Sequence, residues 1–368
     1  MKIKKVEILH ITLPMKFTFT TGFGDISERD AVIVRLETND GVVGYGEAAA
    51  LSAPVYLTET TETCIHIIKD FLVPKLLNRE LTIEEYVNDC SFVRGNNIAK
   101  HGVESALWEI ESLLKKKSLK DLLGGTRSKV PIGESIGVQP SVDKLLEVVG
   151  KRVGEGYRRI KIKVKPGWDC KPLRAIRKKF PKISLMVDAN SSYRLKDMDL
   201  LRKLDEFDLL MIEQPLAFDD IIDHAKVQKE LKTPICLDES ILSAEDARKA
   251  IEIGACRIIN VKPGRVGGLT EVKKINKIAK KNGIKLWCGG MLETGIGKAY
   301  NVAVATLSEF SLPADITPSK TFFGEDVTKQ DIEISNDGFV SVPSGVGMGY
   351  EVVKSRINKY MVKQFEIK

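Results

Sequence analysis

This sequence of 368 residues lacks the marks of a membrane or secreted protein. No apolar run approaches the roughly 18 residues that a membrane span needs. A secretory signal requires an apolar segment after its basic start, and none follows the basic residues 1–5. The six cysteines are scattered without the C-x-x-C spacing of zinc or redox motifs. We therefore expect a protein of the reducing cytoplasm, without a membrane partner.

An excess of charge of one sign is also missing. The 57 basic and 50 acidic residues leave a net charge of +7, and both signs are interspersed along the chain. Proteins that bind nucleic acids or anionic membranes carry concentrated basic patches instead. The composition therefore favours a small-molecule substrate and no nucleic-acid partner.

Residues 1–125 predict an α+β domain. An alternating stretch at 30–48 contains Asn39-Asp40-Gly41, which is a strong signal for a tight hairpin. Helical periodicity follows, and Gly124-Gly125 ends its last segment. The expected helices are residues 59–77, 82–93 and 98–123.

Residues 126–330 show a different, repeating pattern of short apolar runs and amphipathic segments. Eight such alternations predict a parallel sheet, and eight is the number of strands that closes into a barrel. The predicted fold class is therefore α/β, a (β/α)7β-type barrel with an α+β capping domain. Residues 331–368 carry a second hairpin signal, Asn336-Asp337-Gly338, and we expect them to return to the capping domain. The expected barrel strands are residues 130–137, 158–164, 183–190, 209–215, 234–240, 255–262, 284–289 and 311–316.

Charged residues recur at the ends of five successive predicted strands, at intervals of 25, 25, 25 and 24 residues. Catalytic groups in such barrels lie at the carboxyl ends of the strands, so these five side chains should face one pocket. They are Lys163, Asp188, Glu213, Asp238 and Lys262.

The three acids of this set predict a metal site. Carboxylates on adjacent strands repel one another unless a cation lies between them, and oxygen ligands without His or Cys favour Mg²⁺ over Zn²⁺. Asp188, Glu213 and Asp238 are therefore the candidate ligands, with Mn²⁺ as a substitute for Mg²⁺. A purely structural alternative is that these acids cap the following helices, but Asn190 and Ser240 are better placed to do so.

The lysines predict proton transfer. An edge strand at residues 160–164 would be half solvated, but a barrel strand has helices outside and the lumen inside, so Lys161 and Lys163 must point inward. Lys262 ends the opposite strand, and the pair Lys163 and Lys262 should flank the substrate. A lysine acts as a base only when its pKa is lowered, which Mg²⁺ and Lys161 would do. We expect removal of a proton next to a carboxylate, through an enediolate that the metal stabilises.

Together these residues resemble the enolase superfamily, and the resemblance covers nearly the whole chain. The Lys161-Ile162-Lys163 motif with Lys262 is similar to the muconate-lactonizing subgroup, and the four histidines lie away from the predicted strand ends, unlike the base of the mandelate-racemase type. Four longer segments resemble the branch that contains o-succinylbenzoate synthases and N-succinylamino acid racemases. These segments are residues 156–163, 166–169, 188–190 and 289–297.

The resemblance implies a hydro-lyase, the o-succinylbenzoate synthase of menaquinone biosynthesis, which dehydrates 2-succinyl-6-hydroxy-2,4-cyclohexadiene-1-carboxylate. An N-succinylamino acid racemase is the alternative, since both reactions use the same lysines. The resemblance also implies a homo-oligomer, a small dicarboxylate substrate, and capping loops at Phe17–Gly24 and Pro54-Val55-Tyr56. It implies that Asp188, Glu213 and Asp238 bind Mg²⁺, that Lys163 and Lys262 are catalytic, that Ser135, Lys161, Asn190, Gly290 and Met291 line the substrate pocket, and that Glu239 lies behind the ligands.

Three other functions compete with this interpretation. A dipeptide epimerase would share the lysines but hold the substrate's ammonium with a D-x-D pair near the last strand, where this chain has the single acid of Asp315-Ile316-Thr317. A binding module without activity would not need all five strand-end residues. A phosphate-binding barrel would leave the three acids unexplained.

Arg265 has two interpretations. It lies three residues after Lys262 and could tune that lysine or meet a carboxylate, which would favour racemisation. Equally, it could be a surface arginine after Pro263-Gly264.

Overall fold

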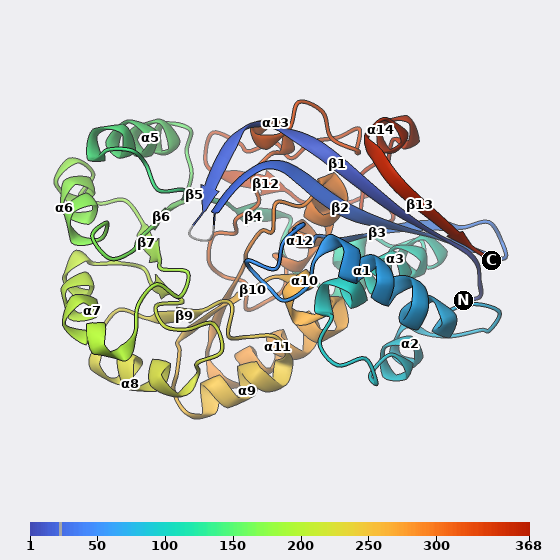
Figure 1. The fold of residues 1–368 in the computed structure, drawn as a ribbon, viewed down its shortest axis with the longest axis horizontal. Coiled ribbons are helices and arrows are strands. Elements are labelled where there is room, and N and C mark those ends of the chain that lie inside the picture. The colour runs from blue at the N-terminus through green and yellow to red at the C-terminus, as the bar shows by residue number, and fades with distance from the viewer. Residues whose placement is uncertain (22–23) are drawn as a thin grey trace.

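A parallel sheet and an antiparallel sheet lie side by side in the computed structural model, which describes residues 1–21 and 24–368 (Figure 1). The parallel sheet has the strand order β11-β10-β9-β8-β7-β6-β5, and helices surround its outer side (Figure 1). Its strands are β5 (Gly133–Ile136), β6 (Arg159–Lys163), β7 (Leu185–Asp188), β8 (Ile212–Glu213), β9 (Ile235–Leu237), β10 (Ile258–Val261) and β11 (Lys285–Cys288).

The helices of the barrel begin at polar capping residues and bury one apolar side. Ser141 and Ser243 each accept a hydrogen bond from the third backbone N–H of the following helix, which satisfies a donor that the helix leaves free. In the first of these helices Leu145 and Val149 face the sheet. The helices are α5 (Val142–Gly154), α6 (Cys170–Lys179), α7 (Met198–Leu204), α8 (Ile222–Glu230), α9 (Ala244–Glu252), α10 (Pro263–Val266), α11 (Leu269–Asn282), α12 (Gly295–Val304) and α13 (Ser319–Phe322), with 3₁₀ turns at Leu195–Asp197 and Asp205–Phe207.

The prediction of a regular eighth strand at 311–316 is wrong. Pro313 interrupts the segment, because proline has no N–H to donate to a strand ladder. The segment nevertheless joins the two ends of the sheet: Asp315 N donates to Cys288 O (2.9 Å), and Gly133 N donates to Ala314 O (2.9 Å). It therefore closes the barrel without the geometry of a strand.

The antiparallel sheet has the order β13-β1-β2-β3, and its hairpin at Asn39-Asp40-Gly41 is confirmed. Gly41 adopts a φ of +81°, which glycine tolerates without strain. A Cβ on Gly46 would lie 2.1 Å from the carbonyl oxygen of Gly102, so strand and helix backbones approach closely there. The strands are β1 (Ile3–Thr21), β2 (Gly24–Thr38), β3 (Val43–Ala48) and β13 (Met361–Ile367).

The helices of the N-terminal part are shorter than predicted. Residues 59–77 change pitch before Pro74, which lacks the N–H that a regular α-helix needs. Residues 98–123 form two helices, because Lys116 adopts a φ of +51° and Ser118 caps a new helix. The elements are α1 (Thr61–Ile67), a π-helical turn (Ile68–Leu72), a 3₁₀ turn (Val73–Lys75), α2 (Ile83–Asp89), α3 (Asn97–Leu114) and α4 (Leu119–Leu123).

The C-terminal segment crosses from the barrel to the antiparallel sheet. The turn at Asn336-Asp337-Gly338 precedes β12 (Phe339–Ser341), which pairs with β4 (Lys129–Pro131). After α14 (Lys354–Tyr360), β13 runs antiparallel to β1 near both chain ends (Figure 1). No helix in the described part of the chain is long and apolar enough to cross a membrane.

Candidate active site

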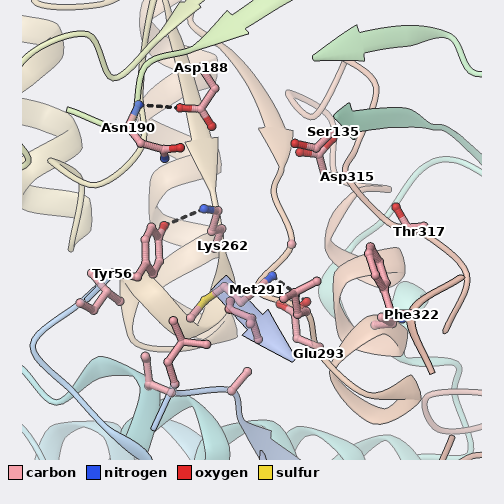
Figure 2. Close-up of a pocket in the computed structure, with 18 of the residues that line it drawn as sticks. Tyr56, Ser135, Asp188, Asn190, Lys262, Met291, Glu293, Asp315, Thr317 and Phe322 are labelled. Atoms are coloured by element: carbon pink, nitrogen blue, oxygen red, sulfur yellow. Dashed lines mark hydrogen bonds between the residues drawn. The ribbon is translucent and has the colours of Figure 1, made fainter. Parts of the chain in front are cut away.

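One pocket lies where the carboxyl ends of the barrel strands meet the N-terminal part of the chain (Figure 2). Leu51, Tyr56 and Ile98 line it from the N-terminal side, and Lys163 and Lys262 line it from the barrel. The two lysines come from β6 and from the end of β10, and three strands separate these in the sheet order. They therefore reach the pocket from opposite sides of the barrel.

Lys163 is held by two oxygen atoms. Its Nζ lies 2.6 Å from Asp188 Oδ2 and donates to Asn190 Oδ1 at 2.6 Å. The alternation of β6 directs Ile160 and Ile162 away from the lumen and Lys163 into it. The arrangement places an amine at the pocket wall with a carboxylate beside it.

Lys262 is held from the other side. Its Nζ lies 2.8 Å from Asp238 Oδ2 and donates to the hydroxyl of Tyr56 at 2.6 Å, while the tyrosine ring centroid is 4.5 Å away (Figure 2). Burial lowers the pKa of Lys262, but Tyr56 and Glu213 outweigh burial and raise it. At Lys262 the protein's own groups therefore raise the pKa instead of lowering it.

Lys161 lies deeper, between three carboxylates, and is only 4% exposed. Its Nζ is 2.7 Å from Asp315 Oδ2, 3.2 Å from Glu213 Oε2 and 3.6 Å from Asp188 Oδ2. Burial lowers the pKa of Lys161, and these acids more than compensate for it and raise the pKa. This lysine offsets part of the negative charge of the buried acids.

The strand-end acids share a buried, mutually repelling environment. Burial and the charge of Asp188 raise the pKa of both Glu213 and Glu239. For Asp188 burial acts in the same direction, but Lys163 and Lys161 outweigh it and lower its pKa. The amide of Asn260 donates to Glu213 Oε1 at 2.7 Å.

The donor set fits a hard divalent cation. Within residues 1–21 and 24–368, no three His, Cys, Asp or Glu side chains converge closely enough to hold a metal as they stand. Asp188, Glu213 and Asp238 each contact a lysine instead. All the donors are nevertheless oxygens, as Mg²⁺ prefers. Glu239 Oε2 is buried without a hydrogen-bond partner among the described residues. A cation would relieve both this orphan atom and the repulsion between the acids.

Arg265 is fully buried, so its interpretation as a surface residue is wrong. The guanidinium contacts Asp238 Oδ1 and the backbone oxygen of Asn260, and Nε donates to Ile241 O at 2.9 Å. Because Asp238 also binds Lys262, the arginine and the lysine share one carboxylate.

The structure brings the predicted site residues together. The predicted pocket residues all line the pocket, and so does Asp188, whereas Glu213 and Asp238 are not among the lining residues. Glu239 accepts a hydrogen bond from Asn190 (3.0 Å). Of the predicted capping loops, Tyr56 reaches the pocket, and the tip of the Phe17–Gly24 segment, residues 22–23, lies outside the described residues. The pocket residues in question are Ser135, Lys161, Asn190, Gly290 and Met291.

Several contacts were missed from the sequence. Arg159 pairs with Asp315 (2.7 Å), and Asn260 donates to Glu213. Asn260 stands between Ile259 and Val261 in an apolar run, whereas Arg159 follows Arg158 and left no such contrast. A polar residue inside such a run was the available signal. Lys298 carried the same signal, since most of residues 295–304 are apolar, and the structure buries all ten of them. The contact of Tyr56 with Lys262 joins residues far apart in sequence and left no local pattern.

The loop after β11 is held by Arg29, which lies in β2. Its Nε donates to Leu292 O (3.1 Å) and an Nη donates to Met291 O (3.2 Å), while another Nη donates to Ala50 O (2.6 Å). Leu292 adopts a φ of +56°, which is unfavourable for a leucine. The arginine thus stabilises a strained loop that lines the pocket.

Comparison with known proteins finds a family match for both parts of the chain. Residues 3–124 match the family model "mandelate racemase / muconate lactonizing enzyme, N-terminal domain", and residues 144–356 match "enolase C-terminal domain-like". The chain is 48% identical to an o-succinylbenzoate synthase from Bacillus subtilis, over 98% of this chain and 97% of that one. It is 44% identical to an N-succinylamino acid racemase from Thermus thermophilus, over 95% and 94% of the two chains. A solved structure of an enolase superfamily member from Listeria innocua has a TM-score of 0.97 at 42% identity, and covers 100% of this chain and 99% of that one.

Proposed function

We infer the function of this chain from its family, since the chain belongs to the enolase superfamily, among the mandelate racemase and muconate lactonizing enzymes. It is an enzyme, and its proposed reaction is that of an o-succinylbenzoate synthase. Water is eliminated from 2-succinyl-6-hydroxy-2,4-cyclohexadiene-1-carboxylate in menaquinone biosynthesis. Full-length identity to relatives of that name supports the assignment.

The observation that carries this proposal is the pair of lysines at opposite sides of one pocket. Lys163 takes the proton next to the carboxylate, and the electron pair left on that carbon moves into the enediolate. The enediolate then expels the neighbouring hydroxyl, which takes a proton from Lys163 and leaves as water. The ammonium of Lys262 stabilises the negative charge from the other face.

Asp188, Glu213 and Asp238 are the proposed ligands of Mg²⁺, with Mn²⁺ as a substitute, and Glu239 supports them through Asn190. When bound, the cation would stabilise negative charge on the oxygens of the enediolate and favour the neutral form of a nearby lysine. Asn190, which holds Lys163 through its Oδ1, keeps the amine oriented toward the pocket. Ser135 and the backbone of Gly290 and Met291 contact the substrate.

N-succinylamino acid racemisation is the second candidate, because relatives at 44% and 40% identity carry that name. In racemisation one lysine removes the α-proton and the other returns a proton to the opposite face. The shared contact of Arg265 and Lys262 with Asp238 supports this candidate. A dipeptide epimerase is disfavoured, since Asp315 already pairs with Arg159 and Lys161 and is neutralised.

The enzyme is also proposed to act in the cytoplasm as a homo-oligomer. Six unpaired cysteines support a reducing compartment, the cytoplasm. The small dicarboxylate substrate is its proposed partner, together with further copies of the same chain in a homo-oligomer.

Turnover of the cyclohexadiene substrate tests this function directly. The purified chain with Mg²⁺ should convert it to o-succinylbenzoate, measured as the change in ultraviolet absorbance when the ring becomes aromatic. L-Ala-L-Glu should remain unchanged in a parallel reaction. Efficient epimerisation of the dipeptide, without formation of o-succinylbenzoate, would contradict the proposal.

A further inference from the structure

Four lysines line the pocket in the described part of the chain, and they are not equivalent. Lys161, Lys163 and Lys262 each lie within 3.2 Å of a carboxylate oxygen. Lys298, in the first turn of α12, takes part in no ion pair among the described residues, and its hydrogen-bond partner there is Ser319 Oγ (2.8 Å). Among the described residues, the ammonium of each of the other three lysines therefore has a carboxylate partner, and that of Lys298 does not.

The surroundings of Lys298 are mostly apolar. The side chain is 4% exposed, and its Nζ lies 5.9 Å and 5.5 Å from the ring centroids of Phe322 and Phe323. Burial lowers the pKa of Lys298, and Asp326, Asp331 and other acids oppose this only at longer range. An ammonium has three donors, so two remain for a ligand. Burying an ammonium without a close counter-ion is costly, and a bound anion would supply the missing counter-charge.

The position of Lys298 separates it from the reacting centre. Phe322, against which the ammonium packs, lies across the pocket from Tyr56 and Asn190 (Figure 2). Tyr56 and Asn190 contact the two catalytic lysines. A ligand held at both ends would therefore place one end at Lys163 and Lys262 and the other at Lys298.

We propose that Lys298 forms an anion subsite that binds the distal carboxylate of the substrate's succinyl arm. This inference rests on the proposed function, because only a substrate with two carboxylates presents an anion at each end. Lys161 is not available to receive the arm, because it is already surrounded by Asp188, Glu213 and Asp315. Ser319 is a positioning residue, since its Oγ orients the ammonium of Lys298.

Substitution of Lys298 tests the subsite. Lys298→Met keeps the length of the side chain and removes the charge. For N-succinyl-phenylglycine, we expect kcat/KM to fall by about 10- to 100-fold, mainly through KM, because a charge-assisted hydrogen bond is lost. For N-acetyl-phenylglycine, which lacks the distal carboxylate, kcat/KM should change less than about threefold. Lys320→Met, at an exposed position in α13, is the matched control and should preserve the ratio of the two substrates.

Two further results make the test decisive. Because Lys298 has no close counter-ion, the thermal midpoint of Lys298→Met should equal or exceed that of the wild type. Lys298→Gln keeps two N–H donors but no charge, and should show the same loss of preference for the N-succinyl over the N-acetyl substrate. An unchanged preference for the N-succinyl substrate, or destabilisation of both variants, would overturn the proposal and leave Lys298 a structural residue. Failure of the wild type to act on any succinyl substrate would instead refute the proposed function.

Discussion

Single buried charges in this protein are sensitive to pH, and Glu109 in α3 is the clearest case. It is 6% exposed, and its Oε2 accepts a hydrogen bond from Met348 N at 2.7 Å. Burial raises the pKa of Glu109 to about 7. The folded protein therefore binds a proton at Glu109 up to about pH 7, whereas the unfolded chain releases it near its ordinary pKa of about 4.3.

This difference predicts the effect of Glu109→Gln. Between the two pKa values the folded state binds more protons than the unfolded state, so the contribution of Glu109 to stability falls as pH rises through this window. It is fully lost above pH 7, by an amount on the order of 3 kcal/mol. The glutamine variant should match the wild type near pH 4, below the unfolded pKa, and be more stable at pH 8, measured by urea unfolding.

The prediction would be wrong if the free energy of unfolding changed by the same amount in the variant and the wild type between pH 4 and pH 8. Glu111→Gln provides the matched control, because Glu111 lies on the same helix and pairs with Lys115 (2.6 Å) near the surface.

Among the elements, the loop after β11 depends most on a residue from another part of the chain. Arg29 binds the carbonyl oxygens of Met291 and Leu292 and connects them to Ala50. Arg29→Met would leave these carbonyls without donors and release the strained Leu292. KM for the cyclohexadiene substrate should rise about tenfold or more, while kcat falls less, because the loop contacts the substrate and not the transferred proton.

Steady-state kinetics of Arg29→Met separate this positioning role from a general loss of fold. Arg79→Met removes a comparable arginine from an exposed pair with Asp89 and should leave KM unchanged. An equal KM in the wild type and Arg29→Met would show that the loop does not need the arginine.

The elements also show what the sequence could predict. The apolar runs ending in Asp188, Glu213 and Asp238 predicted three neighbouring barrel strands, because a run flanked by helices must be buried on both faces. The run at 311–316 had the same apolar character, but Pro313 removed a ladder donor, and the segment closes the barrel through irregular hydrogen bonds. Lys116 ended a helix through a positive φ that periodicity does not reveal.

The sequence could predict site residues that occupy the same position on successive barrel strands. It could not predict contacts between segments that lie far apart in the sequence. The regular interval between Lys163 and Lys262 reflects the barrel repeat itself. The contacts of Arg29 with the loop after β11 and of Tyr56 with Lys262 depend on how the antiparallel sheet packs on the barrel mouth. The division into residues 1–125, 126–330 and 331–368 stays a prediction.

At the scale of the whole molecule, binding of a divalent cation should affect both activity and stability. EDTA should abolish turnover, and Mg²⁺ or Mn²⁺ should restore it. Mg²⁺ should also raise the thermal midpoint of the wild type, because a ligand that binds only the folded state stabilises it. Asp188→Asn, Glu213→Gln and Asp238→Asn should each lose this shift and at least ~100-fold in kcat/KM, with circular dichroism unchanged. Full activity after removal of metal would contradict the metal site.

The central claim is that two lysines act from opposite faces of one substrate, and proton exchange in D₂O tests it most directly. Wild-type enzyme should exchange the α-proton of both enantiomers of N-succinyl-phenylglycine and interconvert them. Lys163→Ala should exchange only one enantiomer, Lys262→Ala only the other, and neither should invert the substrate. Lys163→Arg should behave as Lys163→Ala, since a guanidinium does not lose its proton in a protein. Both alanine variants should also lose dehydration of the cyclohexadiene substrate. Near-wild-type racemisation or dehydration by either alanine variant would contradict the account and leave β6 and β10 without a catalytic pair.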